Sequence, residues 1–304
     1  MDYEFKFEFQ PYQNHFLQPL RTSHGVWQIR EGIIITLTDS AGKNARGEIA
    51  PLPWFGSETL AEALEFCRQQ SETIARQEIY TVPESLPCCQ FALESAYLAL
   101  TQPEPDTTAQ LDFCYLLPAG PKALTDWQDL ARSQPATFKW KIGVLPLLEE
   151  IEILRRLDYD LPNGTKLRLD ANSGLNLSQT EQLLSVTDHL SAIEFIEQPM
   201  SSEHFVEMLQ LSQEHLTPLA LDESVASFEQ LKQAHSGGWR GIYVVKAAIM
   251  GFPSKTIEFC RNNNLDIVLS SVFETAVARR AVLNWAQKLE HPRALGFGVG
   301  HWYC

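Results

Sequence analysis

The chain has 304 residues, of which 44 % are hydrophobic and 20 % are charged, and this length suits one large barrel with an added domain. Its 38 acidic and 24 basic residues give a net charge of −14, which argues against nucleic acid or an anionic membrane as a main partner. No apolar run approaches the roughly 20 residues of a membrane-spanning helix, and the first residues alternate charged and aromatic side chains unlike a signal peptide, so we expect a cytoplasmic protein.

The first hundred residues predict an antiparallel sheet followed by helices, which is an α+β arrangement. Alternating or apolar runs separated by turn-rich segments indicate the strands, and apolar residues spaced by three and four indicate the helices. The predicted strands are 3–10, 26–38 and one that begins at Arg46; the predicted helices begin at Ser57, as an N-cap, and cover 90–100. Two prolines and two acids in Thr101–Thr108 mark the predicted boundary, so we predict a capping domain over residues 1–105.

From about residue 111 the pattern alternates strands with helices, which is typical of a parallel sheet covered on both faces. The predicted strands are 111–116, 138–142, 166–170, 193–197, 218–222, 242–246, 267–271 and 294–298. The predicted helices are 145–158, 178–190, 202–214, 226–235, 254–263 and 273–290. We therefore predict an α/β domain over residues 106–304, a TIM-like barrel of the (β/α)7β type, and allow its C-terminal end to return to the capping domain.

Three acidic residues each close one of these apolar runs. They are Asp170, Glu197 and Asp222, separated by 27 and 25 residues, about one strand plus one helix. Because the C-terminal ends of barrel strands open onto one face, this spacing predicts that the three carboxylates meet. Hard oxygen ligands of this kind suit a divalent cation such as Mg²⁺, with Mn²⁺ as the alternative. Asp222 is preferred to its neighbour Glu223, which is expected to orient a lysine.

Lysines stand on either side of this series. Lys139 and Lys141 flank Trp140, so alternation along a strand turns both to the same side. Ammonium groups inside a barrel are costly unless they are compensated, whereas two neighbouring cations make one of them a poised base. The alternative is a pair of solvated lysines at the rim. Lys246 follows an apolar run 24 residues after Asp222 and is expected in the same site.

Three further residues are candidate substrate contacts. Asn172 follows Asp170 in the run Asp-Ala-Asn, while Ser270 and Ser271 end the seventh predicted strand. No histidine arrangement marks either serine as a nucleophile. The expected substrate is a small carboxylate, because lysines beside a metal suit proton transfer next to a carboxylate that the metal binds. The sequence does not indicate an oligomeric state.

Together, the ordered set Lys-x-Lys, Asp-Ala-Asn, Ile-Glu-Gln-Pro, Asp-Glu-Ser and Val-Lys resembles the muconate-lactonising branch of the enolase superfamily, over nearly the whole chain. The resemblance implies that Asp170, Glu197 and Asp222 bind Mg²⁺ and that Lys141 and Lys246 face each other across the substrate. It further implies that Lys141 is the base, with Lys139 beside it.

Within this branch, the short chain, the run Ser-Ser-Val-Phe-Glu-Thr and a glycine-rich eighth strand are most similar to lyases of menaquinone and phylloquinone synthesis. Such a lyase dehydrates 2-succinyl-6-hydroxy-2,4-cyclohexadiene-1-carboxylate to o-succinylbenzoate through an enediolate. N-acylamino-acid racemases and muconate cycloisomerases share the same lysines and remain alternatives. A barrel glycosidase using Glu197 and Glu274 would leave the lysines unexplained, and a non-catalytic scaffold would leave the whole set unexplained.

Overall fold

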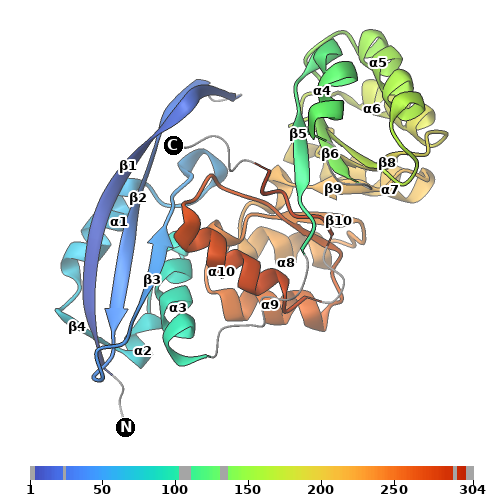
Figure 1. The fold of residues 1–304 in the computed structure, drawn as a ribbon. Coiled ribbons are helices and arrows are strands. Elements are labelled where there is room, and N and C mark those ends of the chain that lie inside the picture. The colour runs from blue at the N-terminus through green and yellow to red at the C-terminus, as the bar shows by residue number, and fades with distance from the viewer. Residues whose placement is uncertain (1–3, 23–24, 103–110, 131–135, 290–292, 299–304) are drawn as a thin grey trace.

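The computed structural model describes residues 4–22, 25–102, 111–130, 136–289 and 293–298. An antiparallel sheet with its helices stands beside a parallel sheet surrounded by helices (Figure 1). The predicted boundary at Thr101–Thr108 falls mostly outside the described residues and stays a prediction. No helix among the described residues is long and apolar enough to cross a membrane.

The N-terminal sheet has four strands in the order β3-β2-β1-β4. They are β1 (Glu4–Thr22), β2 (Gly25–Thr38), β3 (Asn44–Ile49) and β4 (Thr73–Ala75). β1 is much longer than the predicted strand 3–10 because it pairs with β2 along nearly its whole length, with an irregularity between His15 and Leu20. The short strand β4 was not predicted, since three residues are too few to display an alternating pattern.

Helices cover this sheet, as predicted. The two predicted helices are α1 (Leu60–Gln69) and α3 (Pro87–Thr101), and the four-residue helix α2 (Arg76–Ile79) was not predicted. The predicted cap at Ser57 is wrong, because Thr59 caps α1 and its side chain accepts a hydrogen bond from the Glu62 amide, whereas Ser57 Oγ accepts one from the Leu52 amide. α3 is buried on almost every face and packs on β3 and β2.

The second sheet contains seven parallel strands in sequence order. They are β5 (Cys114–Leu117), β6 (Thr137–Lys141), β7 (Lys166–Asp170), β8 (Ile193–Glu197), β9 (Leu219–Leu221), β10 (Ile242–Val245) and β11 (Ile267–Leu269). Most of their residues are buried on both faces, which explains why the sequence displays continuous apolar runs here rather than alternation.

The prediction of a regular eighth strand over 294–298 is wrong, because this segment forms only two isolated parallel bridges. Leu295 bridges to Phe113 beside β5, and Gly296 bridges to Ser270 beside β11. Backbone hydrogen bonds run to both neighbours, from the Cys114 amide to the Leu295 carbonyl and from the Gly296 amide to the Leu269 carbonyl, each 2.8 Å long. Two residues therefore join the first strand of the parallel sheet to the last and complete the predicted barrel-like architecture.

Helices follow the barrel strands. They are α4 (Ala123–Leu130), α5 (Leu147–Asp160), α6 (Leu177–Thr187), α7 (Phe205–Glu214), α8 (Phe228–Ser236), α9 (Pro253–Asn262) and α10 (Ala276–Ala286). Short 3₁₀ turns are η1 (Pro53–Phe55), η2 (Gly120–Lys122), η3 (Ser202–His204), η4 (Glu223–Val225) and η5 (Ala247–Ile249). α4 was not predicted, and α10 begins later than the predicted 273 because the residues before it form a loop that lines the site.

Candidate active site

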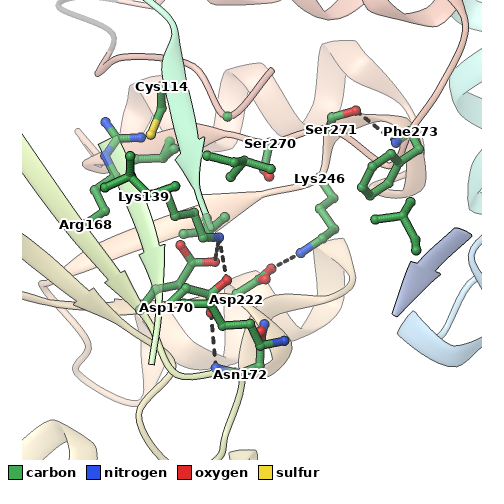
Figure 2. A pocket seen from close by; sticks show the side chains of 18 of the residues that line it. Cys114, Lys139, Arg168, Asp170, Asn172, Asp222, Lys246, Ser270, Ser271 and Phe273 are labelled. Carbon is green, nitrogen blue, oxygen red and sulfur yellow. Dashed lines mark hydrogen bonds and ion pairs between the residues drawn. The ribbon is translucent and has the colours of Figure 1, made fainter. Parts of the chain in front are cut away.

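A cavity of about 780 Å³ opens at the C-terminal ends of the barrel strands. Side chains from the barrel form its floor and sides, and residues of the N-terminal unit complete its wall. Figure 2 shows lysines and carboxylates converging inside it from several strands. All nine predicted site residues line this cavity: Lys139, Lys141, Asp170, Asn172, Glu197, Asp222, Lys246, Ser270 and Ser271.

The three predicted carboxylates end neighbouring strands. Asp170 closes β7 and is in register with Glu197, which closes β8, and Asp222 directly follows β9. Their residues are only 8 %, 2 % and 4 % exposed. Parallel pairing places strand ends at one edge of the sheet, so the 27- and 25-residue spacings become spatial proximity.

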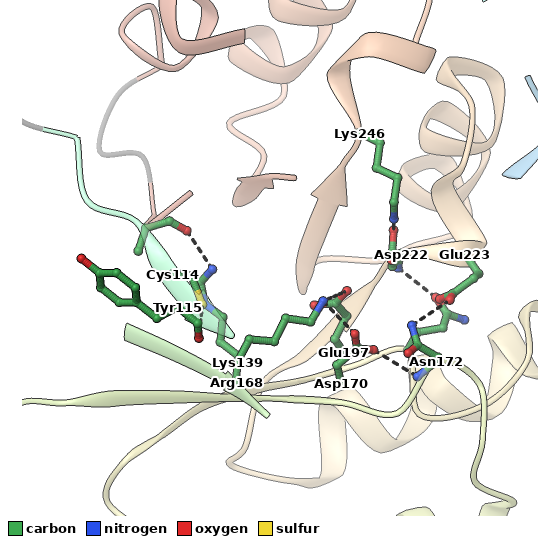
Figure 3. Close-up of polar contacts among 12 residues, drawn as sticks. Cys114, Tyr115, Lys139, Arg168, Asp170, Asn172, Glu197, Asp222, Glu223 and Lys246 are labelled. Carbon is green, nitrogen blue, oxygen red and sulfur yellow. Dashed lines mark hydrogen bonds and ion pairs between the residues drawn. The ribbon is translucent and has the colours of Figure 1, made fainter. Parts of the chain in front are cut away.

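Lys139 forms the centre of the polar network in Figure 3. Its Nζ lies 2.8 Å from Asp170 Oδ2 and 2.8 Å from Glu197 Oε1. Burial alone would lower the pKa of Lys139, but Asp170 and Glu197 raise it well above the ordinary value. Lys139 is therefore a fixed cation that binds two carboxylates together. The sequence had instead predicted that Lys139 acts mainly as a cation beside Lys141.

The other two lysines differ from each other. Lys246 forms a close ion pair with Asp222, and its Nζ lies 3.8 Å from the centroid of the Phe55 ring, an attractive contact for a cation. Lys141 lines the same cavity but makes no hydrogen bond or ion pair with any described residue. One lysine is thus held in place by a carboxylate and an aromatic ring, and the other is available to a ligand.

The carboxylates are buried close to one another, which disfavours their ionised forms. Burial raises the pKa of Glu197, an effect that Lys139 opposes and that Asp170 and Asp222 increase. Burial also raises the pKa of Asp222, against the opposing effect of Lys246. A buried excess of carboxylates favours the binding of either protons or an additional cation.

Within the described part of the chain, no three side chains of His, Cys, Asp or Glu are gathered closely enough to hold a metal ion. The ammonium groups of Lys139 and Lys246 pair with the predicted ligands instead. The structure therefore brings Asp170, Glu197 and Asp222 to one cavity without arranging them as three ligands of one ion.

The loops after β7 and β8 adopt unusual backbone conformations. Asn172 has φ +42° and Gln198 has φ +38°, values that cost energy for residues other than glycine and that concentrate at functional sites. The Gln198 side chain accepts hydrogen bonds from the amides of Asp222 and Ser224. Asn172 donates to Glu223 Oε1 over 3.3 Å, so the hydrogen-bond partner of Glu223 among the described residues is an amide. Burial raises the pKa of Glu223, and the nearby charge of Lys246 opposes this effect.

Comparison with known proteins identifies the family. The family model "MenC, N-terminal domain" matches residues 19–100, and "Enolase C-terminal domain-like" matches residues 123–303. The o-succinylbenzoate synthase of Thermosynechococcus vestitus is 35 % identical over 302 residues, which cover 98 % of this chain and 93 % of that protein. The chain belongs to the o-succinylbenzoate synthase family. The predicted membership of the enolase superfamily is therefore confirmed.

Solved structures agree with this assignment. The o-succinylbenzoate synthase of Thermosynechococcus elongatus, described as complexed with Mg in the active site, has a TM-score of 0.93 at 35 % identity, with 98 % of this chain and 94 % of that chain covered. The L-Ala-D/L-Glu epimerase of Bacillus subtilis has a TM-score of 0.81 at 18 % identity over 98 % of this chain and 90 % of that chain, so it shares the fold. The predicted capping domain and barrel architecture are confirmed.

This member of the o-succinylbenzoate synthase family has further cavity residues that the sequence analysis missed. Arg168 is 2 % exposed, pairs with Glu194 over 2.6 Å and lines the cavity floor beside Cys114. A usable signal existed, because Arg168 interrupts an apolar strand two residues before Asp170 and so shares its face. The aromatic residues Trp27 and Phe273 carried no such signal.

Proposed function

We propose that the chain dehydrates 2-succinyl-6-hydroxy-2,4-cyclohexadiene-1-carboxylate to o-succinylbenzoate with the help of Mg²⁺, as a step of menaquinone or phylloquinone synthesis. One observation carries the proposal beyond family membership. A single cavity unites three strand-end carboxylates with Lys141, which has no ion pair among the described residues, and with Lys246, which is paired with Asp222. In this set Lys141 can remove a proton from the carbon beside a carboxylate, and Lys246 can stabilise the negative charge that results.

The donor set fits Mg²⁺ in its chemistry. Asp170, Glu197 and Asp222 offer hard carboxylate oxygens, and their buried negative charge favours an added cation. When bound there, Mg²⁺ would act as a Lewis acid that polarises the substrate carboxylate. Two ammonium groups already pair with these carboxylates, so metal binding competes with them.

Lys141 begins the proposed reaction. Its Nζ removes the proton from the carbon next to the ring carboxylate, and the electron pair of that C–H bond moves onto the carboxylate to form an enediolate. Lys246, kept in place by Asp222 and the face of Phe55, stabilises the negative charge where it develops. Lys139 holds Asp170 and Glu197 in position.

The second step releases water. The enediolate electrons return to form a ring double bond as the C–O bond to the hydroxyl group breaks. Protonated Lys141 gives its proton to the departing hydroxide, so the lysine is neutral again and one water molecule has formed. The ring becomes aromatic, which makes the elimination favourable without a finely shaped pocket.

A racemase is the main competing function, because Lys141 and Lys246 could serve opposite faces of a substrate. The two lysines are not equivalent, however. Lys246 is paired with Asp222 and lies against Phe55, and Lys141 has no such partners among the described residues. This asymmetry favours one base and one fixed cation, so we expect dehydration to be faster than racemisation of an N-succinylamino acid.

The test is turnover of the cyclohexadiene substrate by the purified chain, with Mg²⁺ and after chelation by EDTA. We expect Mg²⁺-dependent formation of o-succinylbenzoate, and Lys141→Ala should lower kcat by roughly a thousandfold, which is within the range of general base catalysis. Lys255→Ala is the matched control, because Lys255 lies on α9 against Phe252, away from the cavity. Activity that survives EDTA, or a near-normal rate in Lys141→Ala, would contradict the mechanism.

A further inference from the structure

Two loops from different parts of the chain line the same cavity. One is the segment 51–56 of the N-terminal unit, which contributes Trp54 and Phe55, and the other is the segment 270–275 after β11, which contributes Phe273. The Trp27 ring contacts both, with centroids 4.9 Å from Trp54 and 5.5 Å from Phe273 in edge-to-face arrangements. We call Trp27, Trp54 and Phe273 the aromatic wall.

Phe273 is held in an unfavourable backbone conformation. Its φ is +59°, in the left-handed region that bulky residues rarely occupy. Its amide donates to Ser271 Oγ over 2.9 Å, a bond drawn in Figure 2, and its carbonyl accepts from Arg30 Nε over 3.2 Å. Such a conformation persists only when its surroundings hold it, and here both backbone polar groups are bound.

Arg30 on β2 binds both loops at once. While Nε donates to the Phe273 carbonyl, Nη1 donates to the Pro51 carbonyl over 2.8 Å and to the Glu31 carbonyl over 2.9 Å. The guanidinium group also lies over the Trp27 ring, 5.4 Å from its centroid. One side chain therefore contacts both loops, at Pro51 and at Phe273, and also the Trp27 ring that joins the aromatic wall.

The environment of Arg30 is unusual for a cation. The residue is 2 % exposed and has no carboxylate ion pair among the described residues. Burying an arginine without such a partner is costly. Its planar fork, however, can bind several carbonyl groups at fixed angles, which the single ammonium group of lysine cannot do. Arg30 is absent from the described lining of the cavity, so it acts through the groups that it holds.

We propose that Arg30 is a positioning residue for substrate binding: by joining the Pro51 and Phe273 carbonyls it fixes the two loops and the aromatic wall around the substrate. This role of Arg30 rests on the proposed dehydration only in the kinetic part of its test, since KM and kcat require turnover. Lys141 and the carboxylates come from other strands, and Lys246 keeps its ion pair with Asp222 even where Phe55 shifts, so the catalytic groups stay in place when Arg30 is replaced. Loss of Arg30 therefore weakens binding more than it slows the chemical steps.

Arg30→Met, which keeps length and removes the donors, tests this. We expect the KM for the cyclohexadiene substrate to rise about tenfold while kcat stays within about threefold, the pattern for lost uniform binding. Arg30→Lys should give an intermediate KM. Amide hydrogen exchange should become faster in segments 51–56 and 270–275 and remain unchanged in the strands of the barrel. Arg76→Met is the matched control, because Arg76 lies over Tyr97, outside the cavity lining, and should leave KM and both loops unaffected.

Several results would overturn the proposal. They are a wild-type KM in Arg30→Met, a fall in kcat with KM unchanged, and exchange that increases throughout both sheets in Arg30→Met and Arg30→Lys alike. If the wild-type chain does not dehydrate the substrate, the proposed function fails separately. Exchange in the two loops still tests Arg30 in that case, because it requires no turnover.

Discussion

At the scale of single residues, the three lysines of the cavity differ in their partners more than in their positions. Lys139 binds two carboxylates, Lys246 binds one carboxylate and an aromatic face, and Lys141 binds no described residue. Sequence spacing placed all three correctly in one cavity. It could not assign their partners, because strand alternation determines the face of a side chain and not the rotamer or the neighbours that it meets.

Replacing Lys139 should reveal how strongly the carboxylates repel each other. Lys139→Met leaves Asp170 and Glu197 buried without their ammonium partner, and removing one member of a buried ion pair costs about 3 kcal/mol. We expect that loss in the free energy of unfolding when EDTA is present. Excess Mg²⁺ should recover part of it, because a ligand that binds only the folded state stabilises it. Urea unfolding with and without Mg²⁺ measures both effects.

The matched control is Lys166→Met. Lys166 Nζ lies 3.6 Å from Glu194, and its side chain is 59 % exposed, so its removal should cost less than about 1 kcal/mol with or without Mg²⁺. A loss in Lys139→Met that Mg²⁺ leaves unchanged would mean that the metal does not bind at these carboxylates.

At the scale of elements, sequence patterns located the helices and strands better than their ends. Long amphipathic or apolar runs carry their own signal, so most predicted barrel helices and strands lie close to the observed ones. Some helix starts, unlike the locally capped start of α1, depend on distant partners. Buried Glu58 accepts bonds from the first amides of α3, at Cys88 and Cys89, and buried Glu94 accepts one from the Ser254 amide of α9. Caps supplied across the fold have no local sequence pattern.

The loop between β11 and α10 contains a carboxyl group that should make stability depend on pH. Burial raises the pKa of Glu274, and nearby Glu48 raises it further. Between the ordinary value and the raised value, the folded protein keeps a proton that the unfolded chain has released. The unfolded state then binds fewer protons, so the stability of the wild type falls as pH rises through this window.

Glu274→Gln should remove this contribution. The amide oxygen can still accept the bonds from Ser271 Oγ and the Val272 amide, but the side chain cannot ionise. We expect the variant to gain stability relative to the wild type as pH rises above the ordinary carboxyl pKa of 4.5, measured by urea unfolding at each pH. Glu62→Gln is a control of opposite sign, because the hydrogen bond from the Thr59 amide lowers the pKa of Glu62. A pH-independent difference for Glu274→Gln would contradict the argument.

At the scale of the whole molecule, the sequence predicted the two kinds of sheet and missed how they are joined. The N-terminal unit caps two barrel helices directly. Glu48 accepts bonds from the Thr275 and Ala278 amides at the start of α10, and Glu94 binds both the amide and the hydroxyl of Ser254. These contacts link residues more than 150 positions apart, and a single sequence contains no signal for them.

This joining predicts that the two units unfold together. Because Glu48 and Glu94 satisfy helix amides that would otherwise be buried without partners, neither unit keeps its full stability alone. We expect urea unfolding followed by far-UV circular dichroism and by tryptophan fluorescence to give superimposable single transitions. In Glu48→Ala/Glu94→Ala the single transition should split into two, because the units then unfold separately, and fluorescence reports on both units through Trp27 and Trp54 in one and Trp140 and Trp239 in the other. Glu65→Ala/Glu72→Ala, at exposed positions of the N-terminal unit, is the control that should preserve one transition. Two transitions in the wild type, or one transition in the first double variant, would mean that the cross-domain caps do not couple the units.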